Sequence, residues 1–182
     1  MAIYMKFEGV EGSATQADHQ DWIEIDFFSW SVEHKVAASD ARRPGGGGGD
    51  SGTGKRSKLG LPRIQPMVLA KPVDESSADL LDAAMYNTTG KTCWLEFTTT
   101  ANQVYLKYQL DDTVITEIKH EVREGSDRPV ETITLDFIKY KMTVYQLGID
   151  NLAGLPFTHE HDRRNDTQLM SGGPTPGSTP TA

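Results

Sequence analysis

Alternation of apolar and polar residues runs through most of the chain and predicts β-strands. In residues 22–32 apolar side chains occupy both alternating faces, which predicts a bulge near Phe27–Phe28 or burial on both sides. Consecutive strands joined by short turns predict a β-barrel or a two-sheet sandwich. The predicted strands cover residues 2–8, 22–32, 63–71, 91–99, 103–110, 113–123 and 130–147.

One segment, Ser76–Met85, has the pattern of a helix instead. We expect Ser76 to cap its N-terminus, with Asp79 three residues further on. Leu81, Ala84 and Met85 fall on one face at helical spacing, so this face is expected to pack on the strands. The predicted fold is therefore mainly β, with one flanking α-helix.

A long break separates the second predicted strand from the third. It covers about residues 35–62, more than the ~12–15 residues usual for a structureless loop in a compact domain, and it contains the glycine run of residues 45–49. We expect a long extended Gly-rich arm here, on a domain that covers residues 1–157. Residues 158–182 hold too few apolar side chains to pack and are expected to form a disordered tail.

Part of the break, residues 49–55, nearly spells the phosphate-binding loop GxxxxGK[ST]. The position of the Mg²⁺-binding hydroxyl is occupied by Arg56, although Ser57 follows. No apolar strand precedes the motif, and Gly60 and Pro62 oppose the helix that would have to follow it. A flexible glycine loop with a basic end is the preferred interpretation over a nucleotide site.

The composition is that of a globular protein, with 37% hydrophobic residues and a net charge of −8, which disfavours nucleic-acid binding. Cys93 is the one cysteine, so no internal disulfide forms. The N-terminus lacks an apolar signal region, and no run approaches the ~20 apolar residues of a membrane span. We expect a cytoplasmic protein without membrane insertion that leaves the cell, if it does, without a cleaved signal peptide.

Catalytic candidates are few. His159-Glu160-His161-Asp162 places two imidazoles two residues apart, as in some zinc hydrolases, but a working site needs a third protein ligand. Cys93 lies within a predicted strand, where cysteine is usually a small buried hydrophobe. We therefore expect no catalytic residue, no metal site and no cofactor.

Several motifs, in their order and spacing, resemble the Hcp family, the tube proteins of bacterial type VI secretion systems. The resemblance covers about residues 1–150. It rests on Tyr4-x-Lys6-Phe7-x-Gly9-Val10-x-Gly12-Ser13-x-Thr15, His19-x-x-Trp22-Ile23-Glu24, Phe28-Ser29-Trp30-Ser31, Lys71-x-x-Asp74-x-Ser76-Ser77-x-x-Leu80 and Pro129-x-Glu131-x-Ile133-x-Leu135-x-Phe137-x-Lys139. The chain departs from the family at Ser31, usually glycine, and at Ala78-Asp79, usually Ser-Pro.

The resemblance implies a structural protein: a β-barrel subunit that forms homohexameric rings, which stack into the inner tube of a contractile injection machine. It implies as further partners the VgrG spike, the contractile sheath and small effector proteins held in the ring lumen, and export of the subunit with its cargo. It places Ser29 on the lumen wall.

The arm is expected to join stacked rings, since it carries basic residues away from an acidic body. The residues expected to make this contact are Arg42, Arg43, Gly47, Lys55, Arg56 and Lys58. The alternatives are an enzyme, either a degenerate phosphate-binding-loop protein or a metallohydrolase using His159 and His161, and a specialised exported effector. Residues after Leu147 are too few and too polar for a folded toxic domain.

Overall fold

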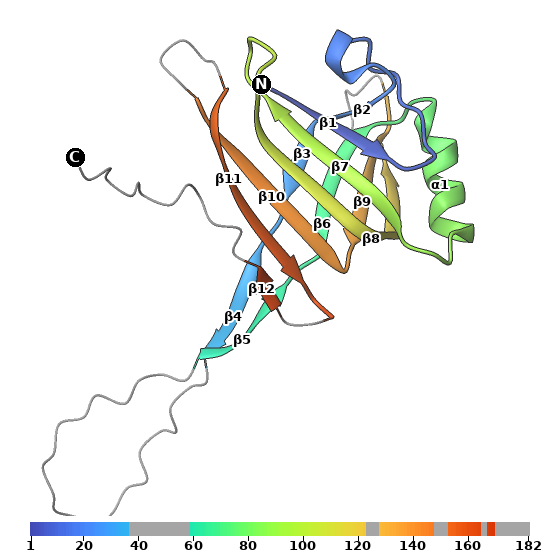
Figure 1. The fold of residues 1–182 in the computed structure, drawn as a ribbon. Coiled ribbons are helices and arrows are strands. Elements are labelled where there is room, and N and C mark those ends of the chain that lie inside the picture. The colour runs from blue at the N-terminus through green and yellow to red at the C-terminus, as the bar shows by residue number, and fades with distance from the viewer. Residues whose placement is uncertain (37–58, 123–127, 148–152, 165–166, 170–182) are drawn as a thin grey trace, which may run out of the picture. The chain divides into compact units, whose positions relative to one another are not determined.

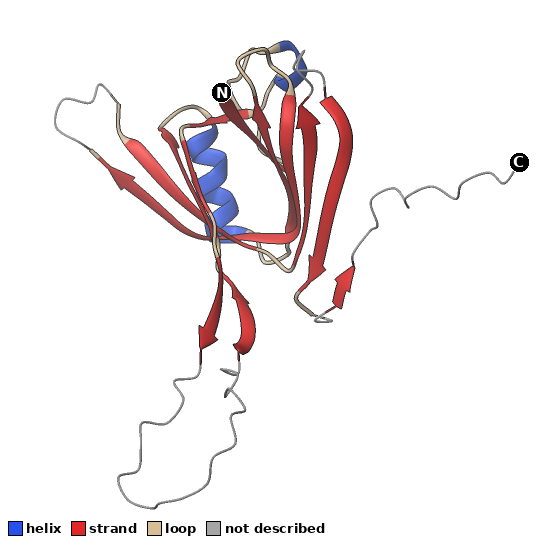
Figure 2. Cartoon of the chain, turned by 90° about the vertical axis from the view of Figure 1, so that its left-hand side faces the viewer, coloured by secondary structure: helices blue, strands red, loops and turns tan. Residues whose placement is uncertain are grey.

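A computed structural model of the chain describes residues 1–36, 59–122, 128–147, 153–164 and 167–169. The described residues are mainly strands, with one α-helix and one short 3₁₀-helix (Figures 1 and 2). They divide into a main unit, Met1–Ser29 with Pro66–Ala182, and an arm unit, Trp30–Gln65. The prediction of a mainly β fold with a flanking helix is confirmed.

The main unit is a barrel built from two antiparallel sheets. Its elements are β1 (Ala2–Phe7), η1 (Ala17–His19), β2 (Ile23–Ile25), β3 (Phe27–Ser29), β6 (Met67–Pro72), α1 (Ser76–Tyr86), β7 (Lys91–Thr98), β8 (Val104–Glu121), β9 (Val130–Asp136), β10 (Lys139–Leu147), β11 (Ala153–Asp162) and β12 (Thr167–Leu169). The first sheet has the order β12-β11-β10-β8-β7-β1-β2, and the second β3-β6-β9-β8. They share β8 and meet again at Asp26, whose N–H donates to the carbonyl of Ala70 at 2.9 Å.

The shared strand β8 joins two segments that the sequence predicts as separate strands. Its first half pairs with β7 and β10, and its second half with β9. Between them Asp112 adopts φ 53°. The pairing register with β7 shifts between Leu110 and Thr113, and that with β9 shifts between Ile115 and Glu117. The expected turn at this point is therefore a bend that passes the strand from one sheet to the other.

The apolar residues of each strand meet inside the barrel. Phe28, on β3, stacks on Tyr108 with ring centroids 5.6 Å apart and contacts the edge of Phe97 at 5.0 Å. The predicted strand 22–32 is divided into β2, β3 and the start of the arm unit, and the expected irregularity lies at Asp26. The largest fully buried side chains are Phe7, Lys71, Phe137, Met5, Ile23, Met67, Leu69, Leu80, Leu95, Leu110, Ile133 and Leu135.

Helix α1 begins at the expected residue but is rotated relative to the expectation. Leu80 is fully buried, whereas Leu81 and Met85 are 41% and 63% exposed, so the predicted packing face is wrong. The predicted serine cap is also wrong: Asp74 Oδ1 accepts from the Ser76 N–H at 2.9 Å. Buried hydrogen bonds of Ser77, described below, fix the rotation of the helix.

The arm unit consists of an antiparallel strand pair, β4 (Val32–Val36) and β5 (Leu59–Ile64). This strand pair includes residues 35–36 and 59–62, which were expected to belong to the unpaired arm. Trp30 Nε1 donates to the carbonyl of Gln65 at 3.0 Å at the base of the pair. Residues 37–58 lie outside the described residues.

The expected domain boundary at residue 157 is wrong. Residues 158–162 belong to β11, which pairs with β10 from Lys139↔Asp162 to Leu147↔Ala153, and β12 follows. The Tyr140 ring stacks on His159 with ring centroids 5.6 Å apart, so this polar segment is held by cross-strand contacts. Residues 170–182 of the expected tail lie outside the described residues.

Candidate functional site

The outer surface of the second sheet carries uncharged side chains over three neighbouring strands. We call it the uncharged face. Its six members stand in two rows set by the strand register: Ser29↔Val68↔Thr134 and Phe27↔Ala70↔Thr132. Because side chains alternate along a strand, the residues between them point into the barrel instead.

Phe27 is the prominent member of this face, since its side chain is 53% exposed. Beside it lies an open hollow of about 440 Å³, which is lined by Asp26, Phe27, Ala70, Val130 and Thr132. The small Ala70 side chain leaves this space open. An exposed aromatic ring beside an open hollow can contact an apolar side chain of another molecule.

Ser29 lies on the same face and is exposed. Its position in the register places Val68 and then Thr134 directly beyond it across the sheet. The face thus offers hydroxyl groups at Ser29, Thr132 and Thr134 among apolar neighbours. Such a surface suits many different polypeptide partners, because no member presents a charge.

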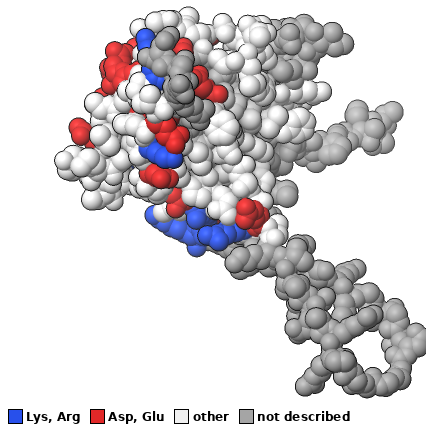
Figure 3. Space-filling view, turned by 180° about the vertical axis from the view of Figure 1, so that it is seen from behind, with Lys and Arg blue, Asp and Glu red and all other residues white. Residues whose placement is uncertain are grey.

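A charged row on β8 borders the uncharged face. Glu117 and Lys119 are the register partners of Thr134 and Thr132, and Glu121 is that of Val130. The hydrogen bond and the charge of Glu121 hold the pKa of Lys119 above its usual range, with Nζ 2.5 Å from Oε1. Seen from behind, the molecule shows a broad uncharged surface beside a row of acidic and basic side chains (Figure 3).

A buried ionic cluster lies behind this sheet, where β6, β9 and α1 meet. Lys71 Nζ lies 2.7 Å from Glu131 Oε1 and 2.7 Å from Asp74 Oδ1. The Ser77 hydroxyl donates to Glu131 at 3.0 Å, and His120 Nε2 lies 3.1 Å from the other Glu131 oxygen. The cluster ties the start of α1 to both strands.

The cluster lowers the pKa of the Asp74 carboxyl group. Burial raises its pKa, but hydrogen bonds from Lys71 and Ser76 and the charge of Lys71 outweigh burial, so the pKa lies below its usual range. Lys71, Asp74, Ser77 and Glu131 all belong to motifs on which the family resemblance rests. Their role in the structure is to hold the helix on the barrel.

The candidate zinc motif at the end of β11 is divided between two faces of a strand. His159 and His161 lie on the face of Tyr140, with His161 buried and its ring centroid 6.0 Å from that of Tyr140. Alternation places Glu160 and Asp162 on the opposite face. Among the described residues, no three His, Cys, Asp or Glu side chains are grouped to hold a metal ion.

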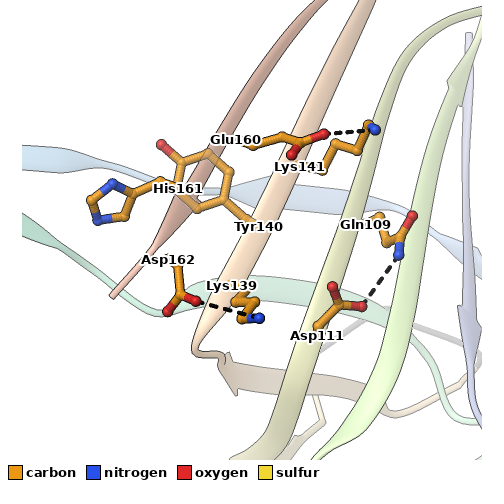
Figure 4. Close-up of a pocket in the computed structure, with 8 residues that line it drawn as sticks. All are labelled: Gln109, Asp111, Lys139, Tyr140, Lys141, Glu160, His161 and Asp162. Carbon is orange, nitrogen blue, oxygen red and sulfur yellow. Dashed lines mark hydrogen bonds and ion pairs between the residues drawn. The ribbon is translucent and has the colours of Figure 1, made fainter. Parts of the chain in front are cut away.

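On that opposite face the acidic side chains form cross-strand ion pairs (Figure 4). Lys141 pairs with Glu160 at 2.6 Å and Lys139 with Asp162 at 3.3 Å. They line a hollow of about 330 Å³ on the surface of β8, β10 and β11. The pairing of these charges argues for a solvated strand surface rather than acid–base chemistry.

Of the remaining candidate residues, one is buried and the others lie outside the described residues. Cys93 is fully buried, and burial raises the pKa of its thiol, so the sulfur is no nucleophile. The phosphate-loop-like segment and all six residues expected in ring stacking lie outside the described residues: Arg42, Arg43, Gly47, Lys55, Arg56 and Lys58.

The family resemblance singled out Ser29 but not its neighbours on the face. The alternation groups Phe27 with Ile23 and Ile25 but left open whether a bulge or burial on both faces explains the pattern. The break at Asp26 reverses that alternation. Alternation along the sequence shows that Val68 and Ala70 share one face of a strand, as do Thr132 and Thr134. The register that places these strands beside Ser29 depends on tertiary pairing, which alternation does not determine.

The barrel with a helix at its side, an arm unit and an uncharged sheet face defines a β-rich structural or binding protein. Comparison with known families is specific: the family model described as "Type VI secretion system effector, Hcp" matches residues 4–144. The chain belongs to the Hcp family. It is thus a type VI secretion system tube or effector protein of a secreted family that self-assembles into rings.

Solved structures share this fold. A structure titled as a type six secretion system protein has a TM-score of 0.77 at 21% identity, with 92% of this chain and 98% of that chain covered. Hcp1 from Salmonella typhimurium has a TM-score of 0.69 at 18% identity, with 92% and 98% covered. A type VI secretion system effector from Yersinia pestis has a TM-score of 0.65 at 19% identity, with 88% and 98% covered.

No curated protein matches the sequence. In the part of the chain that the structure describes, no helix has the length and apolar character needed to span a membrane. The family of the chain is one of structural tube proteins, and nothing favours the enzyme alternatives.

Proposed function

We propose that this protein forms homohexameric rings that stack into the inner tube of a type VI secretion system and carry small effector proteins in their lumen. Six copies arranged head to tail close a ring, and unlike top and bottom faces allow rings to stack. The observation that carries the cargo function is the uncharged face with Ser29 and Phe27 side by side on β3.

In this proposal the uncharged face lines the ring lumen. A wall of hydroxyl and small apolar groups can contact effectors that differ in their surface charge, because the wall itself carries no charge. Such contacts are individually weak, so repetition of the same face by every subunit supplies the affinity through multivalency. Weak individual contacts also permit release of the cargo after delivery.

The basic arm is proposed to contact the next ring in the stack. The whole chain has 26 acidic and 18 basic residues, so a neighbour offers acidic partners for Arg42, Arg43, Lys55, Arg56 and Lys58. Each exposed ion pair contributes only about 0–1 kcal/mol, which suits a tube that must come apart. The spike and the sheath are the further proposed partners at the tip and the outer wall of the tube.

Mass measurement tests the ring. Light scattering behind a sizing column should give six times the 20.1 kDa of one chain, and shortening residues 45–58 should remove larger assemblies while the ring persists. A wild-type protein that stays monomeric at tens of micromolar contradicts the ring. Larger assemblies that persist in the shortened variant contradict the role of the arm.

Charge substitution on the uncharged face tests cargo binding. Ser29→Arg and Thr132→Arg should leave the ring mass unchanged and abolish co-purification of small effectors from the same secretion system, expressed with the subunit. Thr100→Arg is the matched control, because Thr100 is exposed in the turn between β7 and β8 and is not a member of this face. Equal effector recovery by all three variants argues against a lumen role for the face.

A further inference from the structure

The loop between β1 and β2, residues 8–22, is folded on itself and carries the 3₁₀-helix η1 (Figure 1). We call it the β1–β2 loop. The Ala14 N–H donates to the Trp22 carbonyl at 2.9 Å, and the Asp21 N–H donates back to the Ala14 carbonyl at 3.1 Å. His19, at the end of η1, is only 1% exposed. The ring and the cargo contact proposed above make no use of this buried imidazole.

The His19 ring packs against β1 and β7. It stacks on the Tyr4 ring with centroids 4.2 Å apart and contacts the edge of Trp22 at 5.0 Å. Its Nε2 lies 2.9 Å from Oε2 of Glu96 on β7, and its Nδ1 lies 2.8 Å from Oε1 of Gln16 in the loop. Both ring nitrogens therefore face oxygen atoms.

The Gln16 oxygen is an acceptor, because Asp18 fixes the orientation of the Gln16 amide. Oε1 of Gln16 also accepts the Asp18 N–H at 2.9 Å, and Nε2 donates to Asp18 Oδ2 at 3.4 Å. Reversing the amide would place its NH₂ group against the Asp18 N–H, and two donors would face each other. The Nδ1 atom of His19 therefore donates to Gln16.

The Glu96 oxygen is an acceptor as well. Lys107 Nζ lies 2.6 Å from the other Glu96 oxygen, Oε1, so the carboxylate is already in an ion pair. An ionised carboxylate only accepts hydrogen bonds, and the Nε2 atom of His19 therefore donates to it. An imidazole that donates from both nitrogens carries a proton on each and a positive charge.

We propose that His19 is a buried imidazolium that fastens the β1–β2 loop to the first sheet, and that loss of a ring proton to water releases the loop. In the neutral ring one nitrogen keeps a lone pair that faces an oxygen, so one of the two hydrogen bonds is lost. The loop is fastened at low pH and is released as the pH rises, because the folded loop holds the proton. Imidazole is the side chain that changes charge nearest to neutral pH, which makes this loop a pH-sensitive device. The device depends on neither the ring nor the cargo.

The charges on this surface offer a matched pair for a test. Glu24 and Glu96 flank Tyr4 on its two sides in the register Glu24↔Tyr4↔Glu96, but only Glu96 contacts the His19 ring. Burial and the charge of Glu24 raise the pKa of the Tyr4 hydroxyl, so the ring stacked on His19 stays neutral. The charged side chains on the elements packed against His19 at this surface are Glu96 on β7, Lys107 on β8, Glu24 on β2, Lys6 on β1, and Asp18 and Asp21 in the loop.

Solid-state ¹⁵N NMR of the isotope-labelled full-length protein tests the charge, since the method also suits large assemblies. With His19 assigned through its neighbours in the chain, wild type at pH 7 should show a proton on both ring nitrogens. Glu96→Gln places an amide that can donate to Nε2, so this variant should hold the neutral ring with its proton on Nδ1. Glu24→Gln is the matched control and should keep both protons.

Hydrogen–deuterium exchange of residues 8–22, followed by mass spectrometry and corrected for the intrinsic effect of pH, tests the release. Protection in wild type and Glu24→Gln should fall about tenfold or more as His19 loses its proton, because a hydrogen bond between charged groups is lost. Glu96→Gln should show no such fall. A neutral His19 in wild type at pH 7, or protection that stays constant while the proton leaves, overturns the proposal. The wild-type titration alone decides both points, so they do not depend on the folding of either variant.

Discussion

The Nζ atom of Lys71 lies 2.7 Å from Oε1 of Glu131, and both side chains are fully buried. Two charges inside a barrel core cost desolvation energy, which only close pairing and further hydrogen bonds can offset. Asp74, Ser77 and His120 supply those further contacts. The pair therefore makes β6, β9 and the start of α1 depend on one another.

Lys71→Met should be strongly destabilising, because it leaves the carboxylate of Glu131 buried without its cation. We expect the free energy of unfolding in urea to fall by about 3–5 kcal/mol. Lys71→Met combined with Glu131→Leu should recover part of that loss, since no buried charge remains. A double variant less stable than the single one contradicts this account.

Lys139→Met is the matched control for the buried lysine. Lys139 pairs with Asp162 at 3.3 Å on the surface, and its side chain is 47% exposed. Exposed ion pairs contribute about 0–1 kcal/mol, so the urea midpoint should move little. If Lys139→Met lowered the free energy of unfolding as much as Lys71→Met does, burial of the ion pair would not explain the effect of Lys71→Met.

Asp74 should make the protein sensitive to acid. Its pKa lies below the ordinary value of about 3.9 expected in the unfolded chain, so its stabilising contribution is complete above that value and is lost as the pH falls through the folded pKa. Asp74→Asn should therefore be less stable than wild type at pH 7, and the difference in free energy of unfolding should narrow towards pH 3. Asp82→Asn, at an exposed position on α1 outside the buried cluster, is the matched control.

The sequence predicted the strands and the helix well because apolar periodicity is a local property. It predicted neither the rotation of α1 nor the path of β8. Leu81 and Met85 look like a packing face, but Leu80 and the buried hydrogen bonds of Ser77 determine which side faces the barrel. That choice depends on Lys71 and Glu131, which lie on strands far away in the sequence.

The candidate site was only partly predictable for the same reason. Ser29 was singled out by the family resemblance, whereas the apolar residues on both faces of this strand left the face of Phe27 undecided. One residue, Asp26, breaks the alternation by joining two sheets, and a single-residue shift exchanges the faces of a strand. The strand β11 was missed because its alternation is between histidine and carboxylate rather than between apolar and polar residues.

Gly12 should not tolerate a side chain. A Cβ atom there would lie 2.2 Å from the carbonyl oxygen of Trp22, and the Gly12 N–H donates to the Asp21 carbonyl at 3.0 Å. Gly12→Ala should therefore displace backbone and lower the free energy of unfolding by about 1–3 kcal/mol. Glu11→Ala, at an exposed neighbour, should stay within about 0.5 kcal/mol of wild type. Equal thermal unfolding of both variants would contradict the close approach.

Zinc should not stabilise the folded protein through His159 and His161. Both rings pack beside Tyr140, and the neighbouring carboxylates of Glu160 and Asp162 point to the other face of β11. A site with a micromolar dissociation constant would add about 2.7 kcal/mol when free zinc is at a hundred times that constant, which raises the melting temperature by several degrees. We expect no rise on adding zinc and no fall on adding a chelator. A rise that disappears in His159→Ala would establish a metal site and reopen the hydrolase alternative.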